Sequence, residues 1–284
     1  MLNYKLKVGL VPLRRDVTPR PGIFNWEIAE ARGREITEYI KANYTAADTE
    51  FVDIIGVNPV NVMVNEDDAE WISRRFADEG VDCVLFINGN FGNEEAIAYL
   101  ADKIKKPVCI WAPLDDIIDE DGMRYTDSQC GIFGASRLLQ RLNIPFSHIE
   151  TSKVDSDEFK RDFNKFLNVS CMVKNFDGIR IGVVGLRPKP FTSVIFNEGE
   201  LMQKFGIRSI PINLAVVIDK YNKILAERKA ELEEGEKLLL SRYEMDDLTP
   251  PLLQKVYAFV LLYQELTEEY KLDAISAECW TAMQ

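Results

Sequence analysis

The chain has 284 residues, a formal net charge of −12 and 46% hydrophobic residues, so it is long enough for two ordinary domains with separate cores. An acidic protein repels phosphate backbones, so we expect no nucleic-acid partner. No apolar run approaches the length that spans a bilayer, and the N-terminal segment runs straight into a strand pattern without a signal-peptide pattern. We therefore expect a cytoplasmic protein with no membrane partner.

Strand-like and helix-like segments alternate through the first half of the chain. Apolar runs predict strands at 5–13, 50–57, 81–90, 107–114 and 145–151. Between them, apolar residues at helical spacing and capping residues predict helices at 25–44, 65–80, 92–106 and 128–144. Asn25 is the expected cap of the first helix, and Gly80 the expected stop of the second. This alternation is typical of a parallel sheet covered by helices on both faces.

The second half restarts with the same pattern. A helix at 152–176 leads to "RIGVVGLRPK", which resembles the "KVGLVPLRRD" of the N-terminus and hints at two similar domains. Next, the sequence predicts a helix at 191–206, a strand at 207–214, a long helix at 215–245 with a break at Gly235, and a helix that begins near Pro250. The chain then ends in a strand at 273–280, which we expect to lie inside its sheet. The second domain therefore looks incomplete.

The predicted fold class is α/β, with two consecutive Rossmann-like, doubly wound and mainly parallel domains, the second apparently incomplete. We place the first domain at 1–155, a linking helix at 156–177 and the second, truncated domain at 178–284.

Histidine and cysteine do not form a recognisable reactive site. The five cysteines contain no CxxC pair, and Cys83 and Cys109 lie in apolar runs, which predicts reduced and mostly buried thiols. His148 is the only histidine, so a histidine-rich metal site or a histidine-based triad would lack partners. We interpret His148 as an ordinary surface or hydrogen-bonded side chain. The acidic run at 115–122 does not have the spacing of a calcium-binding loop and is interpreted as a solvated loop.

Candidate binding residues follow the predicted strands, where parallel sheets form their ligand crevice. Arg14 and Arg15 follow the first strand, and arginine is a good hydrogen-bond donor to a polar ligand, although a solvated loop is an equal alternative. Asn88, Asn90 and Phe91 follow the third strand in "NGNFGN", where a simple tight turn is the alternative. A phosphate-binding glycine loop is not supported, because the GxGxxG spacing is absent.

The order of several segments carries a family resemblance. These segments are "KVGLVPLRRD", "FINGNFGNEEAIAYLADKIKKPVCIWAPL", "CGIFGASRLLQRLNIPF", "RIGVVGLRPKPF" and "DAISAECWTAMQ". Together they resemble the L-fucose isomerase and L-arabinose isomerase superfamily, most closely its fucose isomerase-like branch, and the resemblance covers the whole chain as the N-terminal two-domain portion. The resemblance implies an aldose–ketose isomerase of carbohydrate metabolism that uses a divalent metal, usually Mn²⁺, and assembles as a homo-oligomer, a trimer or hexamer.

The resemblance also implies roles for particular residues. The loop with Arg14 and Arg15 would reach the active site of a neighbouring subunit, and Arg187 would lie in the crevice of the second domain. Trp280 and Gln284 would approach the sugar substrate, although Trp280 fits plain core packing as well. The family's metal ligands come after residue 284, so the resemblance predicts no catalytic residue, metal ligand or cofactor in this chain. Whether the chain is itself an enzyme stays open on this basis.

The sequence and the resemblance are therefore compatible with two functions. The first is the N-terminal portion of a metal-dependent aldose–ketose isomerase of the L-fucose/L-arabinose type, inactive alone or active only with its missing half in trans. The alternative is a stand-alone cytoplasmic sugar-binding or regulatory module that uses the crevice without chemistry.

Overall fold

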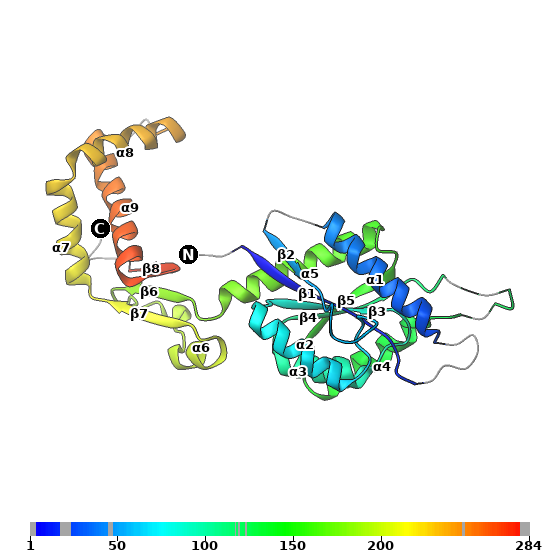
Figure 1. Ribbon diagram of the computed structural model, residues 1–284. Helices are drawn as coiled ribbons and strands as arrows, with labels where there is room; N and C mark the ends of the chain where they lie inside the picture. The colour runs from blue at the N-terminus through cyan, green and yellow to red at the C-terminus, as the bar shows by residue number, and fades with distance from the viewer. Residues whose placement is uncertain are drawn as a thin grey trace. The chain divides into compact units, whose positions relative to one another are not determined.

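The protein is described by a computed structural model that covers residues 4–17, 24–44, 48–116, 118, 120–122, 124–245 and 248–278. Tyr4–Lys174 forms one compact unit, here the first unit, and the residues from Asn175 onward form a second unit. The units contain parallel sheets of five and three strands, which confirms the predicted α/β class (Figure 1). The domain limits given above stay a prediction. Within the described residues, no helix is long and apolar enough to cross a membrane.

The first unit contains a parallel five-stranded sheet in the order β2-β1-β3-β4-β5. Its strands are β1 (Leu6–Leu13), β2 (Thr49–Val52), β3 (Cys83–Asn88), β4 (Val108–Pro113) and β5 (Phe146–Ser152). Its helices are α1 (Trp26–Asn43), α2 (Glu66–Glu79), α3 (Glu94–Ile104), α4 (Ser128–Arg141) and α5 (Asp157–Phe176). The order 2-1-3-4-5 is one of the two common doubly wound arrangements.

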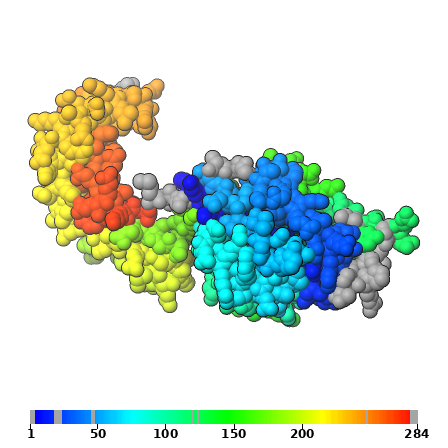
Figure 2. Space-filling model, viewed as in Figure 1, coloured from blue at the N-terminus to red at the C-terminus, as the bar shows by residue number. Residues whose placement is uncertain are grey.

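Helices cover both faces of this sheet, because the central strands are apolar on both sides. Side chains of α1 and α5 pack with Val8, Leu10 and Trp111 on one face. Side chains of α2, α3 and α4 pack with Val11 and Phe86 on the other. In Figure 1, α1 and α5 lie above the sheet and the other three helices below it. In the space-filling view, α2 and α3 form the cyan surface that faces the viewer (Figure 2).

Local sequence signals set several of these helix ends. The side chain of Asn25 accepts a 2.9 Å hydrogen bond from the amide of Ile28 and caps α1, as predicted. Gly80 ends α2 in the left-handed conformation with φ of 69°, which is also as predicted. The predicted strand at 50–57 was too long, since β2 ends at Val52 and the next residues turn.

The second unit has three described strands in the order β7-β6-β8, all parallel. They are β6 (Arg180–Val184), β7 (Arg208–Ile212) and β8 (Ala274–Ala277). A short 3₁₀ helix (Thr192–Val194) and α6 (Glu198–Phe205) connect β6 to β7, while α7 (Leu214–Glu227), α8 (Lys229–Arg242) and α9 (Pro250–Tyr270) connect β7 to β8. The expectation that the last strand lies inside the sheet was wrong for the described strands, where β8 is at the edge.

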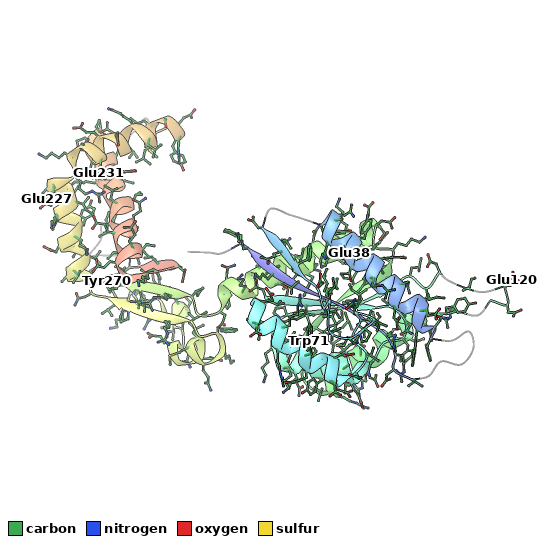
Figure 3. The ribbon with its side chains drawn as sticks, in the orientation of Figure 1. Glu38, Trp71, Glu120, Glu227, Glu231 and Tyr270 are labelled. Atoms are coloured by element: carbon green, nitrogen blue, oxygen red, sulfur yellow. The ribbon has the colours of Figure 1, made fainter. Side chains whose placement is uncertain are left out.

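The long helix predicted at 215–245 is divided at Arg228, not at Gly235. Arg228 closes α7 and precedes α8, and its guanidinium pairs with Glu231 and, at 2.8 Å, with Glu265 of α9. Gly235 lies inside α8, where a Cβ would come within 2.0 Å of the ring of Tyr257. The glycine therefore serves close helix packing, not a helix break. Figure 3 labels Glu227, Glu231 and Tyr270 on these helices.

The thiols and the histidine have the surroundings that the sequence predicted. Cys83 and Cys109 are buried free thiols. Burial raises the pKa of the Cys83 thiol to about 12 and that of Cys109 well above its usual value, so both are inert at neutral pH. His148 lies exposed on β5.

Candidate functional site

The carboxyl ends of β1 and β3 form the topological switch point of the first sheet. From β1 the chain crosses to β2 on one side, and β3 pairs with β1 on the other. Loops that leave such neighbouring strands in opposite directions open a crevice where doubly wound proteins bind ligands. Leu13 pairs in register with Asn88, so the predicted residues after the two strands emerge side by side. The structure thus brings Arg14, Arg15, Asn88, Asn90 and Phe91 together, while their binding role stays a prediction.

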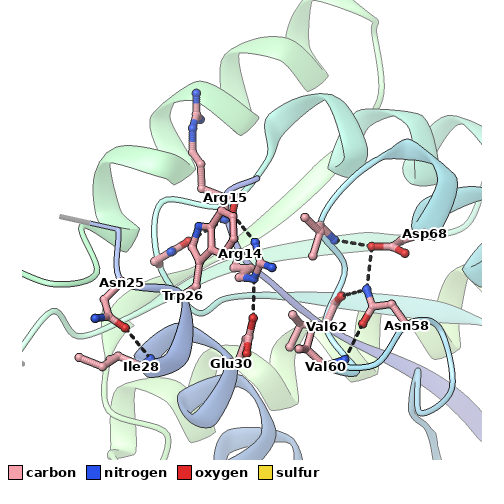
Figure 4. A network of polar contacts seen from close by, with 12 residues as sticks. Arg14, Arg15, Asn25, Trp26, Ile28, Glu30, Asn58, Val60, Val62 and Asp68 are labelled. Carbon is pink, nitrogen blue, oxygen red and sulfur yellow. Dashed lines mark hydrogen bonds and ion pairs between the residues drawn. The ribbon is translucent and has the colours of Figure 1, made fainter. Parts of the chain in front are cut away.

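Arg14 is a buried structural cation. It is 8% exposed, and its Nε donates a 2.7 Å hydrogen bond to Oε1 of Glu30 on α1. Its Nη1 donates to the carbonyl oxygen of Arg15 at 2.8 Å, and its guanidinium lies 4.0 Å from the ring centre of Trp26 (Figure 4). A buried pair of this kind fixes geometry. The solvated-loop alternative is therefore wrong for Arg14, which ties the end of β1 to α1.

Arg15 is held differently. In Figure 4 its side chain extends away from the Arg14–Glu30 pair. Its guanidinium stacks 4.6 Å from the ring centre of Phe91, and Nη1 makes one long bond of 3.4 Å to the carbonyl oxygen of Gly92. The ring of Phe91 is in turn supported edge-on by Phe24, with the ring centres 5.2 Å apart. Among the described residues, no carboxylate forms an ion pair with Arg15.

Asn88 and Asn90 are both fully buried at the end of β3. Asn90 Oδ1 accepts bonds from the amides of Arg15, at 2.9 Å, and Gly92, at 3.2 Å. Asn88 Nδ2 donates to the carbonyl oxygen of Phe91 at 3.2 Å. These bonds shape the turn, and Gly92 enters it with φ of 79°. Two amide atoms, Asn88 Oδ1 and Asn90 Nδ2, have no partner among the described residues, although buried polar atoms normally do.

Gly89 allows the closest approach in this loop. A Cβ at Gly89 would lie 2.5 Å from the carbonyl oxygen of Ala29 on α1, so only glycine fits. The "NGNFGN" segment is therefore a tight turn, which was the alternative interpretation. It also contains the two amide atoms that have no partner among the described residues. The two interpretations of this loop are compatible.

A second polar cluster lies next to this loop and was missed by the sequence analysis. Arg32 of α1 is 9% exposed and donates from Nη1 to Ser128 Oγ at 3.0 Å and to the carbonyl oxygen of Gly89 at 3.3 Å. The same nitrogen lies 3.4 Å from Oδ1 of Asp115, and Nη2 donates to the carbonyl oxygen of Leu114. Burial lowers the pKa of Arg32, and Asp115 partly offsets this effect. Arg32 therefore joins α1 to the loops after β3 and β4.

Asp115 is the acidic centre of this cluster. Its carboxylate accepts hydrogen bonds from Ser128 Oγ at 2.6 Å, from the amides of Ser128 and Gln129 at 3.0 and 3.2 Å, and from Thr126 Oγ1. Burial raises the pKa of Asp115, but these hydrogen bonds outweigh it and the pKa is lowered. Asp115 thus caps α4 from across a loop, since the side chain of Asp127 makes no cap bond.

The solvated-loop interpretation of the run 115–122 was therefore wrong for its first residue. It holds for Asp116 and Glu120, which are exposed, and Figure 3 shows Glu120 far from the sheet. The signal that could have identified Asp115 was its place directly after β4, at the carboxyl edge of the sheet.

The remaining predicted residues lie in the second unit. Arg187 is exposed, and its Nη1 donates to the carbonyl oxygens of Pro188 and Lys189 at 3.3 and 3.2 Å, in its own loop. Glu278, to which no role was assigned, accepts a 3.0 Å bond from the amide of Leu186 and ties the end of β8 to the loop after β6. Trp280 and Gln284 lie outside the described residues.

The described side chains do not offer a metal site. No group of three or more histidine, cysteine, aspartate or glutamate side chains able to hold a metal is found in the described part of the chain. Asp115, the most buried carboxylate at the carboxyl edge, already accepts several hydrogen bonds and faces Arg32. These donors do not fit Mn²⁺, so no catalytic step through a metal is derived from them.

Two hollows are lined by other residues, and the first of them adjoins the carboxyl end of β1 through Pro12. A cavity of about 130 Å³ is lined by residues of α1 and of the segment after β2, among them Thr37, Glu38, Asp53 and Asn61. A more open hollow of about 320 Å³ lies on α2 and is lined by Trp71, Arg74, Arg75, Asp78 and Glu79. Figure 3 labels Trp71 on α2. Neither hollow includes a residue that the sequence selected.

Residues 9–177 match the family described as the fucose/sulfoquinovose isomerase N-terminal domain. This match covers more than half of the chain, so the chain belongs to that family. The finding confirms the resemblance to the fucose isomerase-like branch, N-terminal portion. The matched residues include β1 from Gly9 onward, the whole of β3, and Arg14, Arg15, Asn88 and Asn90 of the switch-point edge.

Individual relatives agree with this assignment. The chain is 21% identical to a protein named sulfoquinovose isomerase from Priestia megaterium over 258 residues, which is 90% of this chain and 54% of the relative. It is 24% identical to a sulfoquinovose isomerase from Alkalicoccus urumqiensis over 224 residues, which is 78% of this chain and 49% of the relative. The chain spans about half the length of the curated relatives it matches.

Proposed function

We propose that this chain is the sugar-positioning N-terminal portion of an aldose–ketose isomerase, and that the switch-point edge of the first unit contacts the sugar. The observation that carries the proposal is the convergence of Arg15, Asn88 and Asn90 at that edge, each with hydrogen-bonding capacity that the described residues do not use. A sugar hydroxyl both donates and accepts, so it complements a spare amide oxygen and spare N–H groups. Family membership over residues 9–177 supports the same function.

Ketol isomerisation moves a proton between C1 and C2 of the open-chain sugar. It needs a carboxylate base and a group that stabilises the enediolate charge. In the intact isomerase we propose that Mn²⁺ supplies this stabilisation, held by ligands outside this chain. The part played by the residues described here is to bind and orient the substrate. Orientation alone removes much of the entropic barrier of such a reaction.

The substrate, assembly and location are part of the proposal. Relatives are named sulfoquinovose isomerases, so we propose sulfoquinovose as a substrate to test beside L-fucose and L-arabinose. We also propose a cytoplasmic homo-oligomer, a trimer or hexamer, in which the loop of Arg14 and Arg15 reaches a neighbouring subunit. Sizing of the purified chain by light scattering checks this last point, and a monomer at micromolar concentration would contradict it.

A binding and turnover experiment tests the function. The purified chain is given the three sugars, with Mn²⁺ and then with a chelator, while binding is followed by calorimetry and ketose by a colorimetric assay. We expect saturable binding of at least one sugar and no ketose from this chain alone. A folded chain that binds none of the sugars would overturn the proposal. Chelator-sensitive ketose would contradict the placement of the metal ligands outside the chain.

A further inference from the structure

Two consecutive arginines at the end of β1 have opposite electrostatic surroundings. The Nε of Arg14 is 2.7 Å from Glu30 in a buried pair. Arg15 is half-buried, and no carboxylate among the described residues forms an ion pair with it, although Asp16 is its neighbour in sequence. Charged side chains that are partly removed from water are normally compensated. The uncompensated charge of Arg15 therefore stands out at a ligand-binding edge.

The surroundings of Arg15 hold the guanidinium in place without neutralising it. The face of the guanidinium lies on the ring of Phe91, and Phe24 supports that ring. Stacking of this kind leaves the N–H edge of arginine free for oxyanions, which the planar fork matches well. Among the described residues, Arg15 makes one side-chain hydrogen bond, the 3.4 Å contact of Nη1 to the carbonyl oxygen of Gly92. Most of its five N–H donors are thus unused.

A further donor lies beside it. The amide of Arg15 donates to Asn90 Oδ1 at 2.9 Å, which fixes the orientation of the Asn90 side chain. Asn90 Nδ2 is then a buried donor with no partner among the described residues. A group that accepts several hydrogen bonds and carries negative charge satisfies both residues, whereas a single neutral hydroxyl leaves the charge of Arg15 uncompensated.

We propose that Arg15 is the receptor for an anionic substituent of the sugar, a sulfonate or a phosphate, so that the switch-point edge selects acidic sugars over neutral ones. This inference rests on the proposed function, because it assumes that a sugar binds at this edge. It assigns different roles to the two arginines: Arg14 is a positioning residue, and Arg15 is a specificity-determining contact.

The test compares matched ligands on the purified full chain by isothermal titration calorimetry. The ligands are sulfoquinovose (6-deoxy-6-sulfoglucose), glucose 6-phosphate and 6-deoxyglucose, which differ only at carbon 6. We expect at least one anionic sugar to bind about tenfold or more tightly than the neutral one, and the affinity for it to fall as NaCl is raised. Which anion binds tighter distinguishes a sulfonate site from a phosphate site.

Variants locate the effect. Arg15→Gln is expected to lower the affinity for the preferred anionic sugar about tenfold, or about 1.4 kcal/mol, and to lower the affinity for 6-deoxyglucose much less, so that the preference for the anion is lost. Arg15→Lys keeps the charge without the stacked fork and is expected to fall between the two. The matched control is Arg137→Gln on α4, an exposed arginine that removes the same charge and is expected to change neither affinity. Amide NMR spectra confirm that each variant is folded.

The outcomes separate this inference from the function on which it rests. Equal affinity for the three sugars in the wild-type chain would overturn the role of Arg15 but leave sugar binding intact. Anion preference that survives Arg15→Gln would also overturn it and would point to another cation. Absence of binding by every sugar to a folded chain would overturn the proposed function itself, and this inference with it.

Discussion

The ends of β1 and β6 have similar sequences but very different surroundings. "KVGLVPLRRD" and "RIGVVGLRPK" both run from an apolar strand into arginine. After β1, Arg14 is buried under α1 against Glu30 and Trp26, and Arg15 stacks on Phe91. After β6, Leu186 is 81% exposed, and the side-chain hydrogen bonds that Arg187 makes among the described residues go to carbonyl oxygens of its own loop. The contacts of an arginine at a strand end are therefore set by the neighbouring helices and loops, not by its local sequence.

The difference follows from the strands next to each loop. In the first unit, β1 is flanked by β2 and β3, and the loop after β3 supplies Asn90 and Phe91. In the second unit, the side-chain hydrogen bond described for the loop after β6 from this side is that of Glu278, which directly follows β8 and accepts from the amide of Leu186. Among the described residues, the carboxyl edge of the first unit therefore has the more extensively connected side chains, and we base the functional proposals on it alone.

The largest expected effect is at the Arg14–Glu30 pair. Glu30→Gln removes the negative charge and leaves Arg14 buried without compensation, so we expect the free energy of unfolding of the first unit to fall by about 3 kcal/mol. Urea denaturation followed by circular dichroism measures it. The control is Glu200→Gln in the exposed Glu200–Lys204 pair on α6, where we expect less than about 0.5 kcal/mol. Equal losses of unfolding free energy in Glu30→Gln and Glu200→Gln would contradict the conclusion that the buried pair at the end of β1 is the more stabilising one.

The second expected effect is at Asp115. Asp115→Asn weakens the hydrogen bonds to Thr126 and Ser128 and leaves Arg32 without its carboxylate, at a cost of about 2 kcal/mol at pH 7. Because the folded pKa of Asp115 is lowered, its stabilisation is present above the unfolded pKa of about 3.9 and is lost as the pH falls through the folded value.

The pH dependence provides the check on Asp115. The stability difference between wild type and Asp115→Asn should be constant from pH 7 to about pH 5 and should shrink below about pH 4. Asp116→Asn is the control, since Asp116 is exposed and, among the described residues, its carboxylate forms one ion pair, with Lys153 at 3.3 Å. A difference between wild type and Asp115→Asn that does not change down to pH 3 would show that the charge of Asp115 does not stabilise α4.

The smallest expected effect is at Arg187. Arg187→Ala removes bonds only to carbonyl oxygens of its own exposed loop, so we expect the free energy of unfolding to change by less than about 0.5 kcal/mol. The same denaturation experiment measures it. A loss above about 1.5 kcal/mol would show that the two strand ends are more alike than the structure describes.

Much of the fold follows from local signals in the sequence. The apolar runs at β1, β3 and β4 and the caps Asn25 and Gly80 were predicted because they act over a few residues. The break at Arg228 was missed because Glu265, which helps to hold it, is 37 residues away. Gly235 was misread because its role is to admit the ring of Tyr257, which the local sequence does not show.

The candidate site was predictable in position but not in detail. The strand-end rule selected Arg14, Arg15, Asn88 and Asn90, and the parallel sheet brings them together. It could not distinguish the paired Arg14 from the unpaired Arg15, because Glu30 is reached only when α1 folds onto the sheet. The Arg32–Asp115 contact joins residues 83 positions apart and gives no local signal.

The measurement that tests the central claim most directly is an amide NMR titration of the ¹⁵N-labelled chain with sulfoquinovose and with 6-deoxyglucose. The account predicts saturable shifts centred on residues 14–16 and 88–92, larger for the anionic sugar, and a loss of that difference in Arg15→Gln. Shifts centred on the loop of Arg187, or no shifts from a folded chain at millimolar sugar, would contradict the claim that the switch-point edge of the first unit binds the sugar.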